Sequence, residues 1–350
     1  MTADVLNGVR ILEFSAIGPV PWGVNILVEM GASVTRVARP GAPRRDPSAS
    51  TDKPADAISE RGRHNVYLDL KSEEGIARVR ELIASHDVLI EGMRPGVMER
   101  LGLGPEQCHA LNPALAYVRV TGWGQQGPLA DRAGHDINYI ALSGALHAIG
   151  PQDGPPVIPL NLVGDYGGGG AFMVIGVLGA VLKARSTGKG SVVDVAMLDG
   201  AAKQMGLAYE RLAMGEWADA RASNVLDGGA PWYGVYRTRC GGYMAVGAIE
   251  PQFYSQLLQG LGLESAGLPD RKDRSQWGVM RSAFEQRFLE RTRDEWTAIF
   301  EPTDACVSPV LSLGEAPKHS HNQARGVFEP RSMGVQPGPA PRFHPLNTES

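Results

Sequence analysis

The sequence has few cysteines and no excess of charge of one sign. Its three cysteines, Cys108, Cys240 and Cys306, lie far apart in 350 residues and form no C-x-x-C pair. Neither a disulfide framework nor a zinc–thiolate site is therefore expected, and a reducing compartment fits this usage. The 34 basic and 38 acidic residues give a formal net charge of -4, which argues against a dedicated surface for nucleic acid or anionic membranes. The expected partner is a small molecule or another subunit.

Long hydrophobic runs are also missing. The most apolar stretch, Ala171 to Leu182, is interrupted by Gly176 and Gly179 and is shorter than the roughly 20 residues that a membrane span needs. The first residues carry an early acid, Asp4, and no basic segment followed by a long apolar run, so no secretory signal is expected. We predict a buried helix at 171–182, no membrane partner and a cytoplasmic location.

Motifs of several common enzyme classes are absent. The sequence contains no G-x-x-x-x-G-K-[ST], no G-x-G-x-x-G after the first predicted strand, no G-x-S-x-G and no H-E-x-x-H. NTPase, simple dehydrogenase, serine hydrolase and zinc-peptidase functions therefore lose support. His319 and His321 lie in a polar region without an obvious third ligand. An exposed loop is the favoured interpretation there, and no metal is assigned.

The N-terminal part alternates between strand and helix patterns. Strands are expected at 10–14, 33–38, 66–70, 87–90, 116–121 and 192–195. Helices are expected at 22–30, after Ser72 as a plausible N-cap, and after 195 through about Met214. Such alternation builds a parallel sheet with ligand sites at the carboxyl ends of its strands.

The pattern changes from Tyr233 onwards. A β-hairpin is expected over 233–239 and 243–249 about Gly241 and Gly242, followed by helices at 251–261 and 276–292. We therefore predict an α/β fold with a Rossmann-like large domain over 1–195, a linker helix and loop over 196–229, a small α+β domain over 230–312 and a return segment over 313–350. The proline-containing tail from Gly334 is expected to be extended or disordered unless it packs on something.

Two segments carry groups suited to proton transfer. Gly134-His135-Asp136-Ile137-Asn138-Tyr139 places an imidazole and a carboxylate at the start of a predicted helix, and Asn161-Leu162-Val163-Gly164-Asp165-Tyr166 precedes four glycines, Gly167 to Gly170. The helix N-terminus would favour the charged form of Asp165, and the glycines would let a ligand come close to the backbone. Taken alone, Asp165 is equally well explained as an N-cap, and His135 as a hydrogen-bonded histidine in a helix-start turn.

These two segments and Ala248-Ile249-Glu250-Pro251-Gln252-Phe253-Tyr254 together resemble the alpha-methylacyl-CoA racemases of the family III CoA-transferase superfamily. The resemblance covers nearly the whole chain and includes 36–40, 68–71, 94–97, 101–105, 122–125 and 227–231. It implies the family III CoA-transferase fold, with a CoA-binding large domain. It also implies an interlocked homodimer, in which large and small lobes of different subunits meet at the active site.

The resemblance further implies inversion of the α-carbon of a 2-methyl-branched acyl-CoA thioester, an activity of lipid and fatty acid metabolism. His135 would serve one face of the α-carbon and Asp165 the other, while the backbone N–H of Asp136 would stabilise the enolate and Glu250 would orient His135. A weakly acidic α-proton requires a base at hydrogen-bond distance together with stabilisation of the enolate. No metal and no cofactor besides the CoA moiety of the substrate is implied.

For the CoA moiety, the family's contacts correspond to Arg39, to Leu68-Asp69-Leu70-Lys71 and to Gly134 through Tyr139, which includes Ile137 and Asn138. Arginine suits this role because its fork of donors binds phosphate oxygens bidentately. Arg94 and Arg100 are further candidates, for which a solvated basic residue on a loop or helix end is an equally good explanation.

Two alternatives stay open. A CoA-transferase would use Asp136 as a nucleophile that carries a covalent anhydride and then a CoA thioester. In transferases the preceding residue is commonly aromatic or otherwise non-basic, whereas His135 precedes Asp136 here and Asp165 is also present, so the racemase is favoured. The second alternative is a non-catalytic acyl-CoA-binding homologue, which would leave His135 and Asp165 unexplained.

Overall fold

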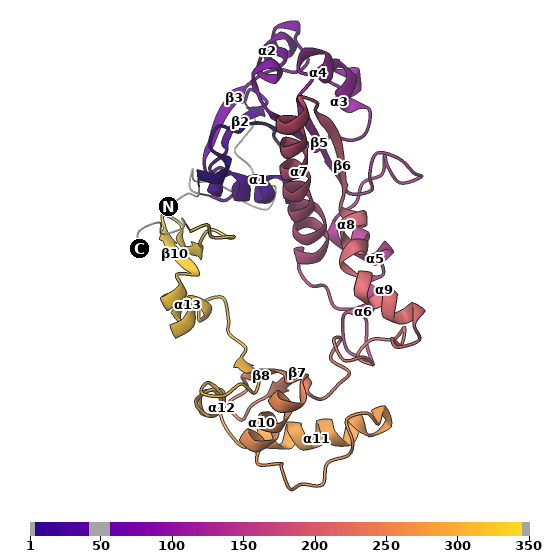
Figure 1. The fold of residues 1–350 in the computed structure, drawn as a ribbon, viewed down its shortest axis with the longest axis vertical. Helices are drawn as coiled ribbons and strands as arrows, with labels where there is room; N and C mark the ends of the chain where they lie inside the picture. Colours follow the sequence, from indigo (N-terminus) through magenta and orange to yellow (C-terminus); the bar gives the residue numbers. More distant parts are fainter. Residues whose placement is uncertain (1–3, 42–56, 345–350) are drawn as a thin grey trace. The chain divides into compact units, whose positions relative to one another are not determined.

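The computed structural model describes residues 4–41 and 57–344 and divides into two compact units. The large unit comprises the described parts of Met1–Ala145, Pro159–Gly206 and Asn322–Ser350, and the small unit comprises Leu146–Ile158 and Leu207–His321. Figure 1 shows the ribbon coloured along the sequence. Two buried apolar clusters belong to the large unit and a third to the small unit, so each unit has a hydrophobic core of its own.

The large unit alternates between strands and helices over most of its length. Its elements in chain order are η1 (Asp4–Leu6), β1 (Arg10–Phe14), α1 (Pro19–Glu29), β2 (Ser33–Ala38), β3 (Arg63–Tyr67), α2 (Glu73–Ser85), β4 (Val88–Glu91), α3 (Val97–Arg100), α4 (Pro105–Leu111), β5 (Ala116–Thr121), α5 (Asp136–Leu142), the π-helical segment η2 (Leu162–Ala171), α7 (Phe172–Thr187), β6 (Ser191–Ala196), α8 (Met197–Gln204), α13 (Ser320–Arg325), β10 (Phe328–Arg331) and β11 (Gly334–Pro337).

A six-stranded parallel sheet forms the centre of the large unit, with strand order β3-β2-β1-β4-β5-β6. Its register puts Leu12 of β1 opposite Thr35 of β2 and Leu89 of β4. The strand order therefore reverses between β1 and β4. In sheets of this type, ligands bind in the crevice outside the carboxyl ends of the strands at such a reversal. The prediction of an α/β fold with a parallel sheet is confirmed.

Helices cover both faces of this sheet because successive side chains of a strand point to opposite faces. Ile11 packs in one cluster with Val24 of α1 and Val177 of α7. The next residue, Leu12, packs in the other cluster with Val79 of α2. Figure 1 shows α7 running alongside β5 and β6. The layers are thus α1 and α7, the sheet, and then α2 with α3 and α4.

The strand predicted at 66–70 lies three residues earlier, at β3. The pattern was misleading because Arg63 is a charged residue in an interior position. Its Nε donates to Glu13 Oε2 at 2.6 Å, and the two side chains are 0% and 1% exposed. A buried charge is tolerated when it is paired and hydrogen-bonded. Sequence periodicity does not reveal such a pair. The strands β1, β2 and β5 have the predicted bounds.

The glycines Gly168 to Gly170 are buried within η2 and allow helices to pack closely. A Cβ on Gly168 would lie 2.7 Å from the carbonyl oxygen of Met197 in α8, and a Cβ on Gly170 would lie 2.4 Å from the ring of Trp22 in α1. Trp22 itself stacks on Tyr166, with ring centroids 5.0 Å apart. Protein atoms therefore occupy the space beside these glycines, and the expectation that they admit a ligand is wrong.

The segments η2 and α7 follow each other without a break from Leu162 to Thr187, so the helical stretch is longer than the predicted 171–182. These 26 residues are long and apolar enough to span a membrane, with a mean hydropathy of 1.6 in the most apolar window. Of that window, 44% is buried inside the protein. Met173, Val177 and Val181 pack in the core beneath the sheet. Burial of this kind is typical of a core helix. A core helix can be as long and as apolar as a membrane span.

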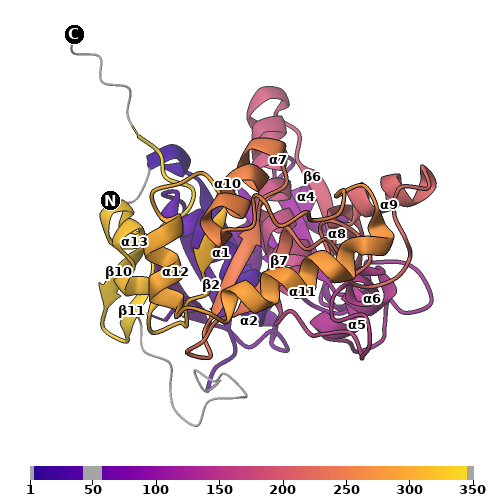
Figure 2. The ribbon, with the colours of Figure 1, turned by 90° about the horizontal axis from the view of Figure 1, so that it is seen from below.

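The small unit is an α+β arrangement around a short sheet. Its elements are α6 (Ala145–Ala148, at the unit boundary), α9 (Gly206–Ala213), β7 (Tyr233–Arg237), β8 (Tyr243–Gly247), α10 (Pro251–Leu261), η3 (Arg274–Gln276), α11 (Trp277–Phe288), α12 (Arg293–Phe300), β9 (Val307–Pro309) and η4 (Ala316–Lys318). The strands are antiparallel in the order β7-β8-β9. Helix α11 packs against β7 (Figure 2). Helix α12 packs against β8 and β9.

The helix predicted at 276–292 ends at Phe288. A second helix, α12, follows, and Thr292 is its N-cap. Thr292 Oγ1 accepts the N–H of Glu295 at 3.2 Å, and Glu295 Oε2 accepts the N–H of Thr292 at 2.7 Å. This reciprocal pair is a capping box and marks a helix N-terminus. The predicted helix through Met214 is likewise two helices, α8 and α9.

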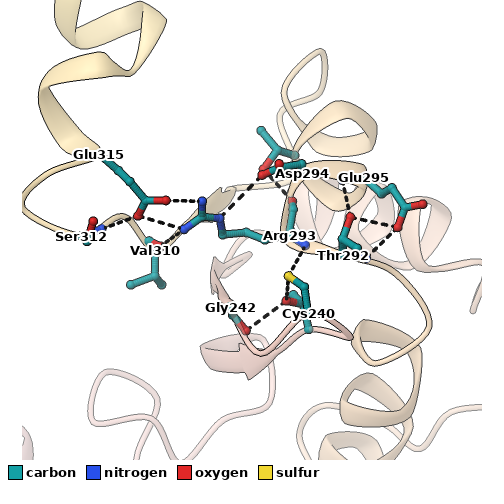
Figure 3. A network of polar contacts seen from close by, with 11 residues as sticks. Cys240, Gly242, Thr292, Arg293, Asp294, Glu295, Val310, Ser312 and Glu315 are labelled. Carbon is teal, nitrogen blue, oxygen red and sulfur yellow. Dashed lines mark hydrogen bonds and ion pairs between the residues drawn. The ribbon is translucent and has the colours of Figure 1, made fainter.

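A polar network joins the β7–β8 turn to the start of α12 (Figure 3). The N–H of Arg293 donates to Cys240 Sγ at 3.4 Å, and this bond, with that of Thr238, lowers the pKa of the Cys240 thiol to about 7. Arg293 Nη2 pairs with Glu315 at 2.6 Å, and this contact, with the N–H of Ser312, lowers the pKa of Glu315 to about 2. The network fixes the segment that leads out of the small sheet.

The tail from Gly334 packs on the large unit as far as it is described. Strand β11 pairs with β10 in an antiparallel hairpin. Arg61 Nη2 donates to Gln336 Oε1 at 2.6 Å, and Arg61 also pairs with Glu29 of α1 at 3.5 Å. We predicted that the tail would be extended or disordered unless it packs on something. The described part of the tail does pack, on the large unit.

Replacing Gly200 by alanine should destabilise the large unit, because the added Cβ would lie 2.1 Å from the carbonyl oxygen of Gly168. Overpacking costs about 1–3 kcal/mol, and more against a rigid backbone. Urea unfolding should show a lowered midpoint. Gly206→Ala, where nothing lies within 4 Å of the added Cβ, is the matched control and should leave the midpoint unchanged. A midpoint unaffected by Gly200→Ala would show that α8 and η2 have room to separate.

Candidate active site

A cavity of about 670 Å³ opens at the carboxyl ends of β1 to β4. It is lined by Phe14, Ser15, Val37, Ala38, Arg39, Pro40, Asp69, Leu70, Lys71, Met93, Val97 and Leu101. Four residues that the sequence analysis assigned to CoA, namely Arg39, Asp69, Leu70 and Lys71, lie in its wall. The wall combines two cationic side chains with apolar ones, and such a lining suits an anionic ligand with an apolar part.

The 68–72 turn is held on the sheet and on α2. The N–H of Leu68 donates to the carbonyl oxygen of Ala38 at 2.9 Å, and the side chain of Leu68 packs against the core. Asp69 Oδ1 accepts the N–H of Lys71 at 2.9 Å. Ser72 Oγ accepts the N–H of Gly75 at 3.0 Å and caps α2, as predicted. These bonds place Asp69 and Lys71 in the wall of the cavity.

Arg119, which the sequence analysis did not identify, fixes the segment after β4. It reaches from β5 to Glu91 Oε1 of β4 at 2.9 Å and to Glu99 Oε1 of α3 at 2.7 Å. Glu91 also accepts the N–H of Met93 at 2.6 Å. The cavity residues Met93, Val97 and Leu101 are thus positioned by a largely buried charge network. The sequence signal for this network was the charge of Arg119 in the middle of the otherwise apolar strand β5.

Arg94 and Arg100 lie beside this segment with exposed side chains. A Cβ on Gly96 would lie 3.1 Å from Arg100 Nη1, so Arg100 folds back over the start of α3. Neither residue is among the described residues that line the cavity. Their assignment to CoA therefore stays a prediction without a contact in its support.

His135 is the N-cap of α5 and is exposed. Its backbone N–H donates to Asn138 Oδ1 at 3.0 Å, which fixes the turn. Tyr139 is buried, and its hydroxyl donates to the carbonyl oxygen of Gly134 at 2.5 Å. The ring of Tyr139 packs edge to face with Trp123 at 4.8 Å. The imidazole therefore projects from a rigid turn, whose inner side is aromatic.

Asp136, next in the chain, is 6% exposed. Its Oδ2 accepts the backbone N–H of Asp165 at 2.7 Å, and its Oδ1 is buried without a partner among the described residues. A Cβ on Gly164 would lie 2.6 Å from Oδ2, so only glycine fits before Asp165. This hydrogen bond joins α5 to the first turn of η2. The position of Gly164 directly before Asp165 was the only sequence signal of this contact.

The carboxylate of Asp165 is half-buried, and its pKa is raised above the ordinary value, mainly by burial. Asn161 Nδ2 donates to Asp165 Oδ2 at 3.3 Å and lowers this pKa, as does the charge of His135, while the charge of Asp136 raises it. A Cβ on Gly18, the N-cap of α1, would lie 3.4 Å from Oδ2. The expectation that a helix N-terminus favours the charged form is therefore wrong for the net shift, because desolvation dominates.

Glu250 belongs to the small unit, where it is the N-cap of α10 and exposed. Its carbonyl oxygen accepts the N–H of Tyr254 at 3.0 Å. Ile137 and Asn138, on the first turn of α5, are exposed in the large unit. No group of three or more His, Cys, Asp and Glu side chains with metal-binding geometry occurs within residues 4–41 and 57–344.

The large unit therefore combines two titratable groups, His135 and Asp165, with a cavity whose lining suits an anionic ligand. His135 and Asp165 lie within electrostatic reach of each other. Both groups lie on the carboxyl-end side of the sheet, since a Cβ on Gly18, after β1, would contact Asp165, and a Cβ on Gly122, after β5, would contact Tyr139 of α5. Such an arrangement suits acid–base chemistry on a bound anionic molecule.

These features define a doubly wound α/β protein whose large unit carries a ligand-sized cavity and a candidate acid–base pair. The chain belongs to CoA-transferase family III, whose pattern it matches over residues 6–349. It is 44% identical to the human alpha-methylacyl-CoA racemase over 98% of this chain and 87% of that protein. It is 28% identical to the mouse succinyl-CoA:glutarate CoA-transferase over 97% of this chain and 80% of that protein.

The fold is also similar to that of a solved family member. The crystal structure of a CAIB/BAIF family protein from Brucella suis matches with a TM-score of 0.79 and 24% identity. The match covers 97% of this chain and 92% of that chain. At this identity the likeness supports the fold, and the family includes both racemases and CoA-transferases.

Proposed function

We propose that this protein is an alpha-methylacyl-CoA racemase, which inverts the α-carbon of 2-methyl-branched acyl-CoA thioesters. The observation that carries the proposal is the different environment of three neighbouring groups. His135 is exposed and Asp165 is half-buried with a raised pKa, whereas the Asp136 carboxylate is buried and bound to the Asp165 N–H. The 44% identity to the human racemase supports the same conclusion.

The reaction would proceed by two-base proton transfer. One base removes the α-proton from its face of the substrate, and the electron pair of the C–H bond moves into the thioester to give the enolate. The protonated group on the opposite face then returns a proton to the α-carbon. Burial of Asp165 raises its pKa towards that of an imidazole, so that the carboxyl group is able to act as an acid as well as a base.

The backbone N–H of Asp136 would stabilise the enolate oxygen. It is the first amide of α5, and the first amides of a helix have no acceptor within the helix. A donor fixed in advance near the developing negative charge lowers the barrier without reorganisation. In this proposal Asp136 contributes its backbone, while its side chain holds Asp165 in place.

The environment of Asp136 disfavours the CoA-transferase alternative. A nucleophilic carboxylate has to reach the thioester carbonyl carbon, but Asp136 is 6% exposed and Oδ2 is engaged at 2.7 Å. The non-catalytic alternative is disfavoured because the exposed imidazole of His135 and the raised pKa of the neighbouring Asp165 would then lack an explanation.

We further propose that the CoA moiety binds along Arg39 and the Leu68–Lys71 turn, with Gly134 to Tyr139 adjoining the thioester. Arg39 and Lys71 would contact phosphate oxygens, and the apolar wall would contact the adenine or the pantetheine arm. CoA enters as part of the substrate, and the reaction needs no separate cofactor or metal. A cytoplasmic location stays a prediction from the cysteine usage.

An interlocked homodimer is part of the proposal. Helix α9 has no buried residue, although it carries Leu207, Tyr209 and Leu212, which are all exposed. On α7, Ile175 and Leu182 are 60% and 69% exposed. Apolar faces of this kind fit burial against a second copy. In such a dimer Glu250 of one subunit would reach His135 of the other.

Exchange of the α-proton tests the reaction directly. Each epimer of a 2-methylacyl-CoA is incubated in D2O, and deuterium incorporation and inversion are followed by NMR without an acceptor acid. His135→Ala and Asp165→Ala should each lower the rate of exchange with inversion by about 10²- to 10⁴-fold, because each removes one proton-transfer group. The affinity for CoA should stay close to that of the wild type.

Asp136→Asn separates the racemase from the transferase. The asparagine keeps an oxygen for the Asp165 N–H and leaves the backbone amide unchanged, so exchange should fall by no more than about tenfold. A transferase would instead show no exchange in the wild type, would transfer CoA to an added carboxylic acid, and would lose that transfer in Asp136→Asn. That pair of results would contradict the proposal.

Asn161→Ala should move the acid limb of the kcat/KM profile to higher pH. Below the pKa of Asp165 its carboxyl group is protonated and no longer available as a base, so activity falls there. The hydrogen bond from Asn161 lowers this pKa, and its loss raises the pKa further. The profile of the epimer whose α-proton Asp165 removes should show this shift. An unmoved acid limb would assign that limb to another group.

Arg39→Ala should raise the Kd for CoA about 10- to 100-fold, because a hydrogen bond to a charged phosphate is worth about 1.5–3 kcal/mol. Titration calorimetry with CoA measures this directly. Arg78→Ala is the matched control, since Arg78 is an exposed arginine of α2 that pairs with Glu81 at the surface and is not among the residues that line the cavity in the described part of the chain. Equal affinities of the two variants would place the phosphates away from Arg39.

A further inference from the structure

Arg271 occupies a corner between two aromatic rings of the small unit. Its guanidinium carbon lies 4.3 Å from the ring centroid of Trp232 and 4.3 Å from that of Tyr254. The two rings meet edge to face, with centroids 6.0 Å apart and an interplanar angle of 77°. Each ring attracts the cation through its quadrupole. Two rings at this angle hold the guanidinium in one place.

The remaining bonds of Arg271 reach the segment that contains Glu250. Arg271 Nη2 donates to the carbonyl oxygen of Ile249 at 2.5 Å. The carbonyl oxygen of Arg271 accepts Trp277 Nε1 at 2.9 Å, which fixes the backbone of the loop. Tyr254, one of the two rings, lies on the first turns of α10, whose N-cap is Glu250. One side chain therefore connects the end of the hairpin with α10.

The charges of Arg271 and Glu250 also interact. Burial lowers the pKa of Arg271, and the negative charge of Glu250 opposes this effect. The thiol of Cys306 lies in the same field, since burial raises its pKa and the charge of Glu250 raises it further. Cys306 has a left-handed backbone, with φ of 54°, and its carbonyl oxygen accepts the N–H of Gly247 at 2.8 Å. Strain of this kind in a non-glycine residue persists where the surroundings over-determine it.

The carboxylate of Glu250 is left free by these contacts. It is exposed, and it makes no hydrogen bond or ion pair with any residue in the described part of the chain. Its backbone is fixed on one side by Ile249 and on the other by α10, while the charge of Arg271 acts on its carboxylate without forming an ion pair among the described residues. An exposed acid that is held in place but not consumed by an ion pair is suited to act on a group outside that unit.

We propose that Arg271 is a positioning residue for Glu250, which it holds through the Ile249 carbonyl oxygen and through the attraction between the two charges. This inference rests on the proposed function, in which Glu250 orients the imidazole of His135. A displaced Glu250 would leave that imidazole misoriented. Small misplacements of this kind lower the rate of the chemical step more than they lower substrate affinity.

A double-mutant cycle tests this role. Glu250→Gln, Arg271→Met and the double variant are compared by the rate of α-proton exchange in D2O and by KM for the acyl-CoA. Loss of a residue that supports a reacting group costs about 10- to 100-fold in activity. We expect such a loss of kcat in both single variants, little change in KM, and a double variant no slower than Glu250→Gln, because Arg271 acts through Glu250.

Arg274→Met is the matched control. Arg274 lies on the same loop, its guanidinium carbon is 5.4 Å from the ring centroid of Trp277, and its Nη2 donates to the carbonyl oxygen of Glu216 at 3.3 Å. Within the described part of the chain it contacts neither Ile249 nor Glu250, so Arg274→Met should retain wild-type kcat. Thermal unfolding of all variants identifies any that fail to fold. If Arg271→Met is unfolded, Arg271→Gln replaces it, with the same expected result.

The outcomes distinguish the inference from the proposed function. Effects of Arg271→Met and Glu250→Gln that multiply in the double variant would overturn the inference, as would equal rates for Arg271→Met and Arg274→Met. Wild-type exchange in Glu250→Gln, with exchange lost in His135→Ala, would overturn it and leave the racemase intact. Unchanged exchange in both His135→Ala and Asp165→Ala would refute the proposed function itself.

Discussion

The hydrogen bond from the Asp165 N–H to the Asp136 carboxylate determines the geometry of the candidate site. It connects two segments that lie 29 residues apart, and its acceptor is buried. Because Gly164 leaves room for that carboxylate, the first turn of η2 lies directly against the start of α5. His135 and Asp165, the two groups able to exchange protons, are thereby brought within electrostatic reach. If this contact were lost, neither residue would keep its orientation relative to the other.

Close helix packing supports that contact. The buried glycines of η2 let α1 and α8 approach its backbone, and Gly200 provides the matching gap on α8. The same sheet edge carries the cavity with Arg39 and Lys71. Arg119, by pairing with Glu91 and Glu99, fixes the opposite wall. The carboxyl ends of the parallel strands therefore carry both the ligand cavity and the candidate acid–base groups.

The racemases and CoA-transferases of this family share a fold, so the environment of each acid decides its chemistry. A carboxylate that is buried and already bound, as Asp136 is, serves as an anchor. A carboxylate whose pKa is raised by burial, as that of Asp165 is, suits proton transfer. In the small unit, Glu250 is exposed while Arg271 is enclosed by Trp232 and Tyr254.

The sequence by itself determined the alternating strands and helices, the hairpin at Gly241-Gly242, the family and the identity of His135 and Asp165, because periodicity, turn residues and short motifs are local. It misplaced β3, since the burial of Arg63 depends on Glu13 from another strand. Only the tertiary structure decided the direction of the Asp165 pKa, the engagement of Asp136 and the role of the glycines. Each of these depends on distances between segments far apart in the chain, and desolvation and close packing act through space, where no sequence pattern records them.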